Sequence, residues 1–271
     1  MMKHLFKIFI TVVLLISACA KVPITGRRQM HLLPESMMMN MASQAYTQFL
    51  NENRSKQVAP STSKDAEMVQ RVGKRIAQAV EEILKEQGQL KRIKGYQWEF
   101  NLIDDPTVNA WCMPGGKVVV YTGILDIAKN EEGLAVVMGH EIAHAVARHG
   151  NERMSQQLAI QMGGISLEVL LDEQPEEAQN LFLQAYGVTA GLGALAYSRK
   201  HESEADHLGL IFMAAAGYNP EAAPAFWERM SQMGGAKPPE LLSTHPSDEK
   251  RVQQIKEWLP EAKIYYESSK K

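Results

Sequence analysis

His140-Glu141-Ile142-Ala143-His144 lies in the middle of a stretch, residues 131–149, whose sequence is strongly helical. Side chains four positions apart project from one face of a helix, so both imidazoles can reach a single ion. Glu141 lies at the side of that face, where it can accept a proton from water at the ion without being a ligand itself. This stretch predicts a metal-binding helix, and the rest of the fold must bring a further ligand to it.

A later acidic segment supplies candidates for that ligand. A catalytic zinc usually has three protein ligands and keeps one position open for water. No third histidine follows at the metzincin spacing, and the next cluster is 201–206, which reads HESEAD. Within it, Glu202 and Asp206 share one helical face. One carboxylate can bind the ion while the other fixes the tautomer of a ligand imidazole. Glu204 is the alternative ligand, but it has no carboxylate four positions on.

The remaining periodicities predict helices on both sides of a small sheet. Apolar residues recur at helical spacing in 36–50, 65–86, 152–171, 175–197, 199–216, 220–233 and 247–258. Between the second and third of these segments, Trp98, Phe100 and Leu102 alternate with polar residues, which indicates a strand with one buried face. The turn at 114–116 precedes a second candidate strand at 117–122. This order predicts an α+β fold, mainly helical with a small antiparallel sheet.

The composition excludes several classes of protein. The chain has 271 residues, a formal net charge of −2 and a hydrophobic content of 45%, which is ordinary for a globular protein. Because there is no surplus of basic residues, nucleic acid is disfavoured as the main partner. Two cysteines cannot build a disulfide scaffold, and Cys112 is expected to pack in the interior.

The first residues have the layout of a secretory signal. Lys3 and Lys7 make a positive start, and the apolar run at 8–16 is too short to span a bilayer comfortably. Residues 1–18 are therefore expected to form a signal peptide that is removed. The remaining chain is expected to be a short tether at 19–34 followed by a single domain at 35–271.

The end of this signal resembles a bacterial lipobox. Its sequence, Ile16-Ser17-Ala18-Cys19, predicts that Cys19 becomes the first residue of the mature chain and carries a lipid that binds the membrane. No aspartate follows the cysteine, so the resemblance favours the outer membrane, with the protein facing the periplasm. Residues 19–34 lack periodicity and are expected to be a lipidated tether or an arm lying on the domain.

Taken together, these motifs resemble the metallopeptidase family of HtpX and the CAAX prenyl endopeptidases (metallopeptidase family forty-eight), especially its bacterial lipoprotein and mitochondrial Oma-type members. The matching stretches are 109–111 with 114–116, 118–125, 139–149, 198–206, 216–220 and 244–246. The resemblance implies a gluzincin-type zincin with one Zn²⁺ per chain, bound by His140, His144 and Glu202. It implies that Glu141 is the catalytic base and that Asp206 lies behind the ligands. It also implies that the substrates are unfolded or misfolded proteins of the cell envelope.

Two features near the expected site have more than one interpretation. Zincins commonly bind the substrate backbone along an edge strand, and the candidate is Lys117-Val118-Val119-Val120-Tyr121. His245 can stabilise the oxyanion, occupy the open position of the zinc, or only shape its loop. Trp111 and Cys112 can line the cleft or pack in the core.

The remaining histidines have other expected places in the fold, and two other functions fit the same motifs. His149 is expected at a helix C-terminus, as a cation at the negative end of the dipole, and His201 and His207 are expected at the surface or behind the ligands. One rival function is a zinc-binding lipoprotein that acts as a chaperone or assembly factor with little proteolytic turnover. Another is a structural lipoprotein in which the histidine motif is coincidental. Substituting Glu141 by Gln and analysing the metal content separate these hypotheses.

Overall fold

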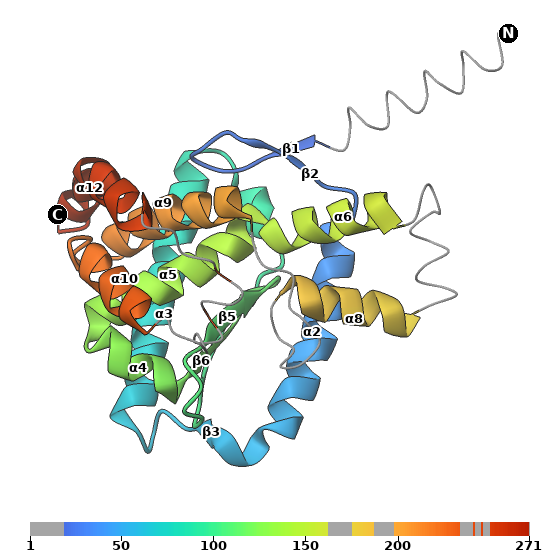
Figure 1. The fold of residues 1–271 in the computed structure, drawn as a ribbon, viewed down its shortest axis with the longest axis horizontal. Helices are drawn as coiled ribbons and strands as arrows, with labels where there is room; N and C mark the ends of the chain where they lie inside the picture. The colour runs from blue at the N-terminus through green and yellow to red at the C-terminus, as the bar shows by residue number, and fades with distance from the viewer. Residues whose placement is uncertain are drawn as a thin grey trace, which may run out of the picture.

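The computed structural model describes residues 19–161, 175–186, 198–233, 241, 245 and 250–270. The expected signal peptide at 1–18 lies outside the described residues, as do the ends of the helices expected at 152–171 and 175–197. Helices surround a central helix, and a small sheet packs against one side of it (Figure 1). The prediction of a mainly helical α+β fold is confirmed.

The helices and strands have the following bounds in chain order: β1 (Cys19–Lys21), β2 (Arg28–Met30), α2 (Glu35–Glu52), η1 (Arg54–Lys56), β3 (Gln57–Val58), α3 (Lys64–Glu86), η2 (Leu90–Ile93), β4 (Glu99–Ile103), β5 (Ala110–Met113), β6 (Lys117–Tyr121), α4 (Thr122–Ala128), α5 (Glu131–Ala147), α6 (His149–Gln161), α8 (Pro175–Ala185), α9 (Arg199–Ala215), α10 (Ala222–Gln232) and α12 (Lys250–Ser268). The helix expected to end at residue 258 continues to Ser268 with Pro260 inside it. Proline is unfavourable inside a helix, so the sequence pattern predicts that the helix ends before Pro260.

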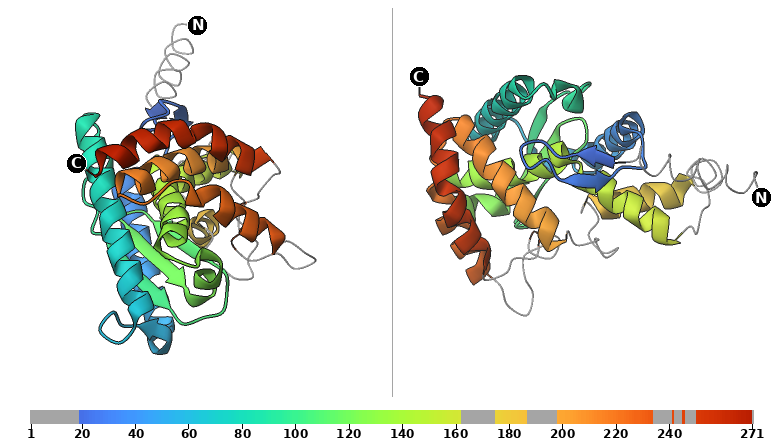
Figure 2. Two further views of the ribbon diagram at one scale, coloured as in Figure 1. Left: turned by 90° about the vertical axis from the view of Figure 1, so that its left-hand side faces the viewer. Right: turned by 90° about the horizontal axis from the view of Figure 1, so that it is seen from above.

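The central helix is α5. Its side chains from Gly133 to Ala147 are all buried, because the helix is apolar around most of its circumference. It lies between α9 on one side and β5 on the other, with α3 and α10 also packed against it (Figures 1 and 2). Since α5 carries the histidine motif and α9 carries Glu202, the core of the fold brings the two predicted ligand segments together.

The sheet is mixed rather than antiparallel. Its strand order is β3-β4-β6-β5, with β4 parallel to β6 and with β5 antiparallel to β6. The turn between β5 and β6 contains Gly115 and Gly116, both with positive φ, and it returns the chain so that β6 inserts between β4 and β5. An alternating pattern predicts that a segment is a strand, but it does not specify the neighbours of that strand.

This order corrects the expected edge strand. The segment Lys117–Tyr121 is β6, which is paired along both sides, with β4 and with β5. The terminal strand on that side is β5, and it lies next to α5. In the described part of the chain, β5 therefore takes the place that β6 was expected to have.

The segment before the first long helix is folded onto the domain. β1 and β2 pair as an antiparallel hairpin, and Val22 and Leu33 are buried. The guanidinium of Arg92 donates to the carbonyl oxygen of Lys21 and to Oε1 of Gln29, and it also donates to the last carbonyls of α5. We call residues 19–33 the arm. This segment was expected to be either a tether or an arm lying on the domain, and its described residues lie on the domain as an arm. No described helix combines the length and the apolar character needed to span a bilayer.

Candidate metal centre

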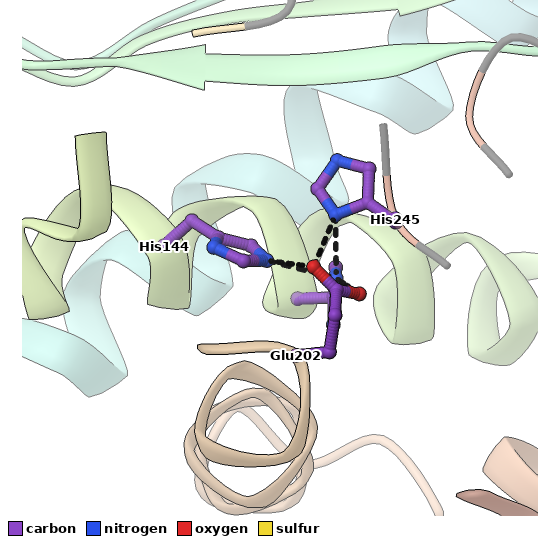
Figure 3. Close-up of side chains that lie close together, drawn as sticks. His144, Glu202 and His245 are labelled. Carbon is purple, nitrogen blue, oxygen red and sulfur yellow. Dashed lines mark hydrogen bonds and ion pairs between the residues drawn. The ribbon is translucent and has the colours of Figure 1, made fainter. Parts of the chain in front are cut away.

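Four buried side chains converge beside α5. They are His140 and His144 from α5, Glu202 from α9 and His245, and one potential ligand atom of each lies within 4.8 Å of the others. In Figure 3, His144, Glu202 and His245 point toward one another, with Glu202 rising from the helix below them. This is a cluster of three imidazoles and one carboxylate in the described residues.

The nitrogen and oxygen atoms of the cluster lie within or close to hydrogen-bonding distance of one another. Nε2 of His140 lies 3.0 Å from Nε2 of His144, and Nδ1 of His245 lies 3.0 Å from Oε1 of Glu202. Oε1 of Glu202 is also 3.4 Å from Nε2 of His144. The other carboxylate oxygen, Oε2, is buried and has no hydrogen-bond partner in the part of the chain described here. Imidazole nitrogens with one carboxylate are a donor set that suits Zn²⁺, so these residues fit the ion that the histidine motif implies.

Asp206 orients one of the imidazoles. Its Oδ1 lies 2.9 Å from Nδ1 of His140, so Nδ1–H donates to the carboxylate and Nε2 is left to face the cluster. A guanidinium nitrogen of Arg251 donates to the same oxygen at 2.6 Å. The guanidinium also lies over the ring of Trp227, 3.3 Å from its centroid. Burial would lower the pKa of His140, but the carboxylates of Asp206 and Glu202 raise it to about 9.

Glu141 lies beside the cluster and is not one of its four members. Its side chain is buried, and burial raises its pKa above the usual range for a carboxyl group, although His245 and His140 oppose this shift. Oε1 of Glu141 lies 3.6 Å from Nε2 of His245. A buried carboxylate with a raised pKa can accept a proton and later release it, which is the behaviour that a general base requires.

Glu204, the alternative ligand, is not part of the cluster. Its Oε2 lies 2.9 Å from Nε2 of His149, on the far side of His144. The expected role of His149 as a helix-terminal cation is wrong, because the chain bends at Arg148, which has a φ of 61°, and His149 begins the next helix. His149 is fully buried, and this burial lowers its pKa to about 4, so the ring is neutral at pH 7.

Two side chains near the site, Trp227 and Arg251, were not predicted from the sequence, and His149 was predicted in a different role. No local pattern marks Trp227 or Arg251, which reach the site only through the packing of α10 and α12. Trp111 and Cys112 were expected either to line the cleft or to pack in the core, and both are buried. Trp111 packs edge-on against Phe49, and burial raises the pKa of the Cys112 thiol.

The buried helix with two histidines one turn apart, and the acidic residue brought to them from a second helix, define a metallopeptidase of the zincin class. The chain belongs to peptidase family M48, whose sequence model matches residues 70–259.

Similar proteins come from mitochondria and from bacteria. The mitochondrial metalloendopeptidase OMA1 of Schizosaccharomyces pombe is 38% identical over 252 residues, which is 92% of this chain and 68% of that protein. The OMA1 metalloendopeptidase of Homo sapiens is 31% identical over 89% of this chain and 46% of its own length. The beta-barrel assembly-enhancing protease of Yersinia pestis is 29% identical over 57% of this chain. This chain spans only 33% of that bacterial relative.

Proposed function

We propose that this protein is a zinc-dependent endopeptidase, tethered to a membrane of the cell envelope by a lipid on Cys19, that hydrolyses unfolded envelope proteins. The observation that carries the proposal is the convergence of His140, His144 and Glu202 beside the buried carboxylate of Glu141. A Zn²⁺ ion held by these residues would supply Lewis-acid chemistry: it would lower the pKa of a water molecule to about 7 and would stabilise negative charge on the carbonyl oxygen of the substrate.

Side chains around the cluster would carry out the proton transfer and hold the ligands in place. Glu141 accepts the proton of the attacking water and passes it to the leaving amine. Asp206 keeps the proton of His140 on Nδ1, so that Nε2 is available to the ion. Arg251 balances the charge of Asp206, and the ring of Trp227 covers the guanidinium of Arg251.

His245 fits the role of a fourth ligand in a closed form of the site. Its Nδ1 lies 3.0 Å from Glu202 and 3.3 Å from Nε2 of His140, inside the cluster. Catalysis requires one position open to water, so we propose that His245 leaves the cluster before substrate binds. Replacing His245 by Ala should then raise the rate of peptide hydrolysis. A large loss of kcat would instead favour the other expected role, stabilisation of the oxyanion.

The proposed binding site for the substrate backbone is the side of β5 that faces away from β6, along which no other described strand is paired. Main-chain pairing along a strand is largely independent of the substrate sequence, which suits an enzyme that acts on unfolded chains. The backbone N–H of Leu241 already donates to the carbonyl oxygen of Val108, just before β5. Leu241 therefore contacts the approach to the strand, and His245 contacts the ligand cluster, which supports a closed resting form.

The envelope location rests on the N-terminal sequence and on one group of relatives. The signal-like residues 1–18, the lipobox cysteine and the name of the Yersinia pestis relative all support it. The OMA1 relatives are named as mitochondrial enzymes, so they support the peptidase activity and not this location. The alternative function is a zinc-binding lipoprotein that assists assembly with little proteolysis.

One experiment separates these functions. Casein is incubated with the mature chain alone, with a chelator, with restored zinc, and with the Glu141→Gln variant. The peptidase proposal predicts that cleavage is lost with the chelator, returns with zinc, and is lost in Glu141→Gln although this variant still binds one zinc. Cleavage that survives both the chelator and the substitution would refute it. Zinc binding without cleavage of unfolded substrates by the wild type and by His245→Ala would favour the assembly factor.

A further inference from the structure

A second cluster of charged and polar side chains, buried except where it meets the arm, lies behind the candidate metal centre. Its members from α6 and α9 are at most 7% exposed, and none of them belongs to the four candidate ligands. The cluster begins at the back of His144 and ends in the arm. Its side chains are Thr25, Arg27, His149, Glu152, His201 and Glu204.

The first step of the connection runs from His144 to Glu204. Nδ1 of His144 lies 2.9 Å from Nδ1 of His149, and Nε2 of His149 lies 2.9 Å from Oε2 of Glu204. The carboxylate can only accept, so His149 carries its proton on Nε2 and accepts at Nδ1 from Nδ1–H of His144. This fixes the lone pair of His144 on Nε2, the nitrogen that faces the ligand cluster.

The second step runs from Glu204 to the arm. Oγ1 of Thr25 donates to Oε1 of Glu204 at 2.5 Å, and Nε of Arg27 donates to Oε2 at 2.7 Å. The two terminal nitrogens of Arg27 donate to the two oxygens of Glu152 at 2.9 and 2.7 Å. Arg27 therefore bridges a carboxylate of α9 and a carboxylate of α6. A bidentate pair of this kind holds both partners in a defined geometry.

The charges explain why the arm matters to Glu204. The carboxylate of Glu204 accepts hydrogen bonds from His149, Thr25 and Arg27, and Arg27 is the permanently charged cation among these three donors. Without the guanidinium, the buried carboxylates of Glu152 and Glu204 would lose the cation that they share. Glu152 would keep only its contact with His201, and Glu204 only those with His149 and Thr25, and removing the cation from a buried charge pair is unfavourable. Glu204 would then be released from the geometry that aligns His149.

We propose that Thr25 and Arg27 of the arm are positioning residues for the metal ligand His144 and that they act through Glu204 and His149. The inference rests on the metal centre of the proposed function and adds a coupling between docking of the arm and retention of the ion. Such a coupling is reciprocal, so zinc also stabilises the docked arm.

The test compares the zinc affinity of variants of the mature chain by competition with a chromogenic chelator. Removing the partner of a ligand imidazole typically weakens metal binding by about 10–100-fold, and we expect His149→Phe to fall in this range. Arg27→Gln should weaken binding by about tenfold, the lower end of the range. Arg28→Gln, at an exposed neighbouring position of the same hairpin, is the matched control and should bind like the wild type.

The outcomes separate this inference from the proposed function. A wild-type chain that binds no zinc would overturn the proposed function itself. Zinc binding by the wild type that is unchanged in both Arg27→Gln and His149→Phe would overturn only the coupling. Weaker binding in both variants, with Arg28→Gln unaffected, supports the coupling.

Thermal melting with and without zinc distinguishes a general loss of stability from a specific loss of zinc binding. A purely structural role of Arg27 would lower both melting temperatures equally, whereas a positioning role shrinks the rise in Tm that zinc produces. Arg27→Lys, which keeps the charge but lacks the planar fork, should retain part of that rise. If Arg27→Gln does not fold, Thr25→Val, which removes the hydrogen bond to Glu204, is used for the same comparison. A zinc-induced rise in Thr25→Val equal to that of the wild type would then overturn the inference.

Discussion

Gly139 of α5 and Gly209 of α9 are in backbone contact. A Cβ atom at Gly139 would lie 2.8 Å from the carbonyl oxygen of Gly209, and one at Gly209 would lie 2.8 Å from the carbonyl carbon of Gly139. Backbone atoms cannot rotate out of the way, so the two helices cross at a distance that only glycine allows. Because His140 follows Gly139 and Asp206 lies about one turn before Gly209, this crossing sets the contact between that imidazole and that carboxylate.

Replacing Gly209 by Ala should therefore disturb both stability and metal binding. We expect a loss of about 1–3 kcal/mol in the free energy of unfolding, typical of overpacking, together with weaker zinc binding. Urea unfolding and chelator competition measure the two effects. Ala215→Ser, at a half-buried position of the same helix, is the control. A change in stability below about 0.5 kcal/mol, the range of ordinary surface substitutions, would show that the crossing tolerates a methyl group.

Asp206→Asn tests the orientation of His140 with little change in shape. The amide can present its NH₂ group to Nδ1 and favour the wrong tautomer, so zinc affinity should fall by about 10–100-fold. The exposed Asp126→Asn is the matched control for loss of one negative charge. Equal affinities of the two variants, measured against the same chelator, would contradict the role of Asp206.

The pH dependence of zinc binding follows from the pKa of His140. In the metal-free chain this pKa is raised to about 9, because Asp206 and Glu202 outweigh the effect of burial. The imidazole is thus protonated at neutral pH and must lose its proton to bind the ion. Zinc affinity should rise by about tenfold per pH unit between about pH 7 and 9 and then level off. Titration calorimetry in two buffers of different ionisation enthalpy should detect about one proton released at pH 7.5, and an affinity that does not depend on pH would contradict this.

Arg92→Met tests how firmly the arm is attached. The buried guanidinium donates to the carbonyls of Val146, Ala147 and Lys21 and to the side chain of Gln29. Its removal leaves these acceptors without their donor, at a cost of about 1–3 kcal/mol for each one that water cannot reach. We expect lower stability and faster proteolysis of the arm, followed by mass spectrometry. Lys91→Met, at the exposed neighbouring position, should change neither.

Local rules explain which parts of the site could be predicted. His140 with His144, and Glu202 with Asp206, are pairs four residues apart on single helices, so the periodicity of the α-helix places each pair on one face. The meeting of the two pairs depends on how α5 crosses α9. From the sequence, this meeting follows only from the need of a zinc site for a further ligand and from the resemblance to a family.

The remaining parts depend on tertiary structure that no local pattern encodes. β5 was missed because its four residues are all buried, so they show no alternation. The place of β6 inside the sheet follows from the path of the chain and not from its own sequence. The role of His149 depends on the bend at Arg148, a non-glycine residue with positive φ. An apolar helical pattern does not predict such a bend.

The hairpin of the arm begins at Cys19, the residue proposed to carry the lipid. An acyl chain there would leave no spacer between the bilayer and the folded domain. The folded domain would then lie directly at the membrane surface, without a long flexible linker. Its active site would reach only substrates close to the bilayer. Under this arrangement, chains stalled at the membrane would be cut, while the same sequences diffusing freely in the bulk would be spared.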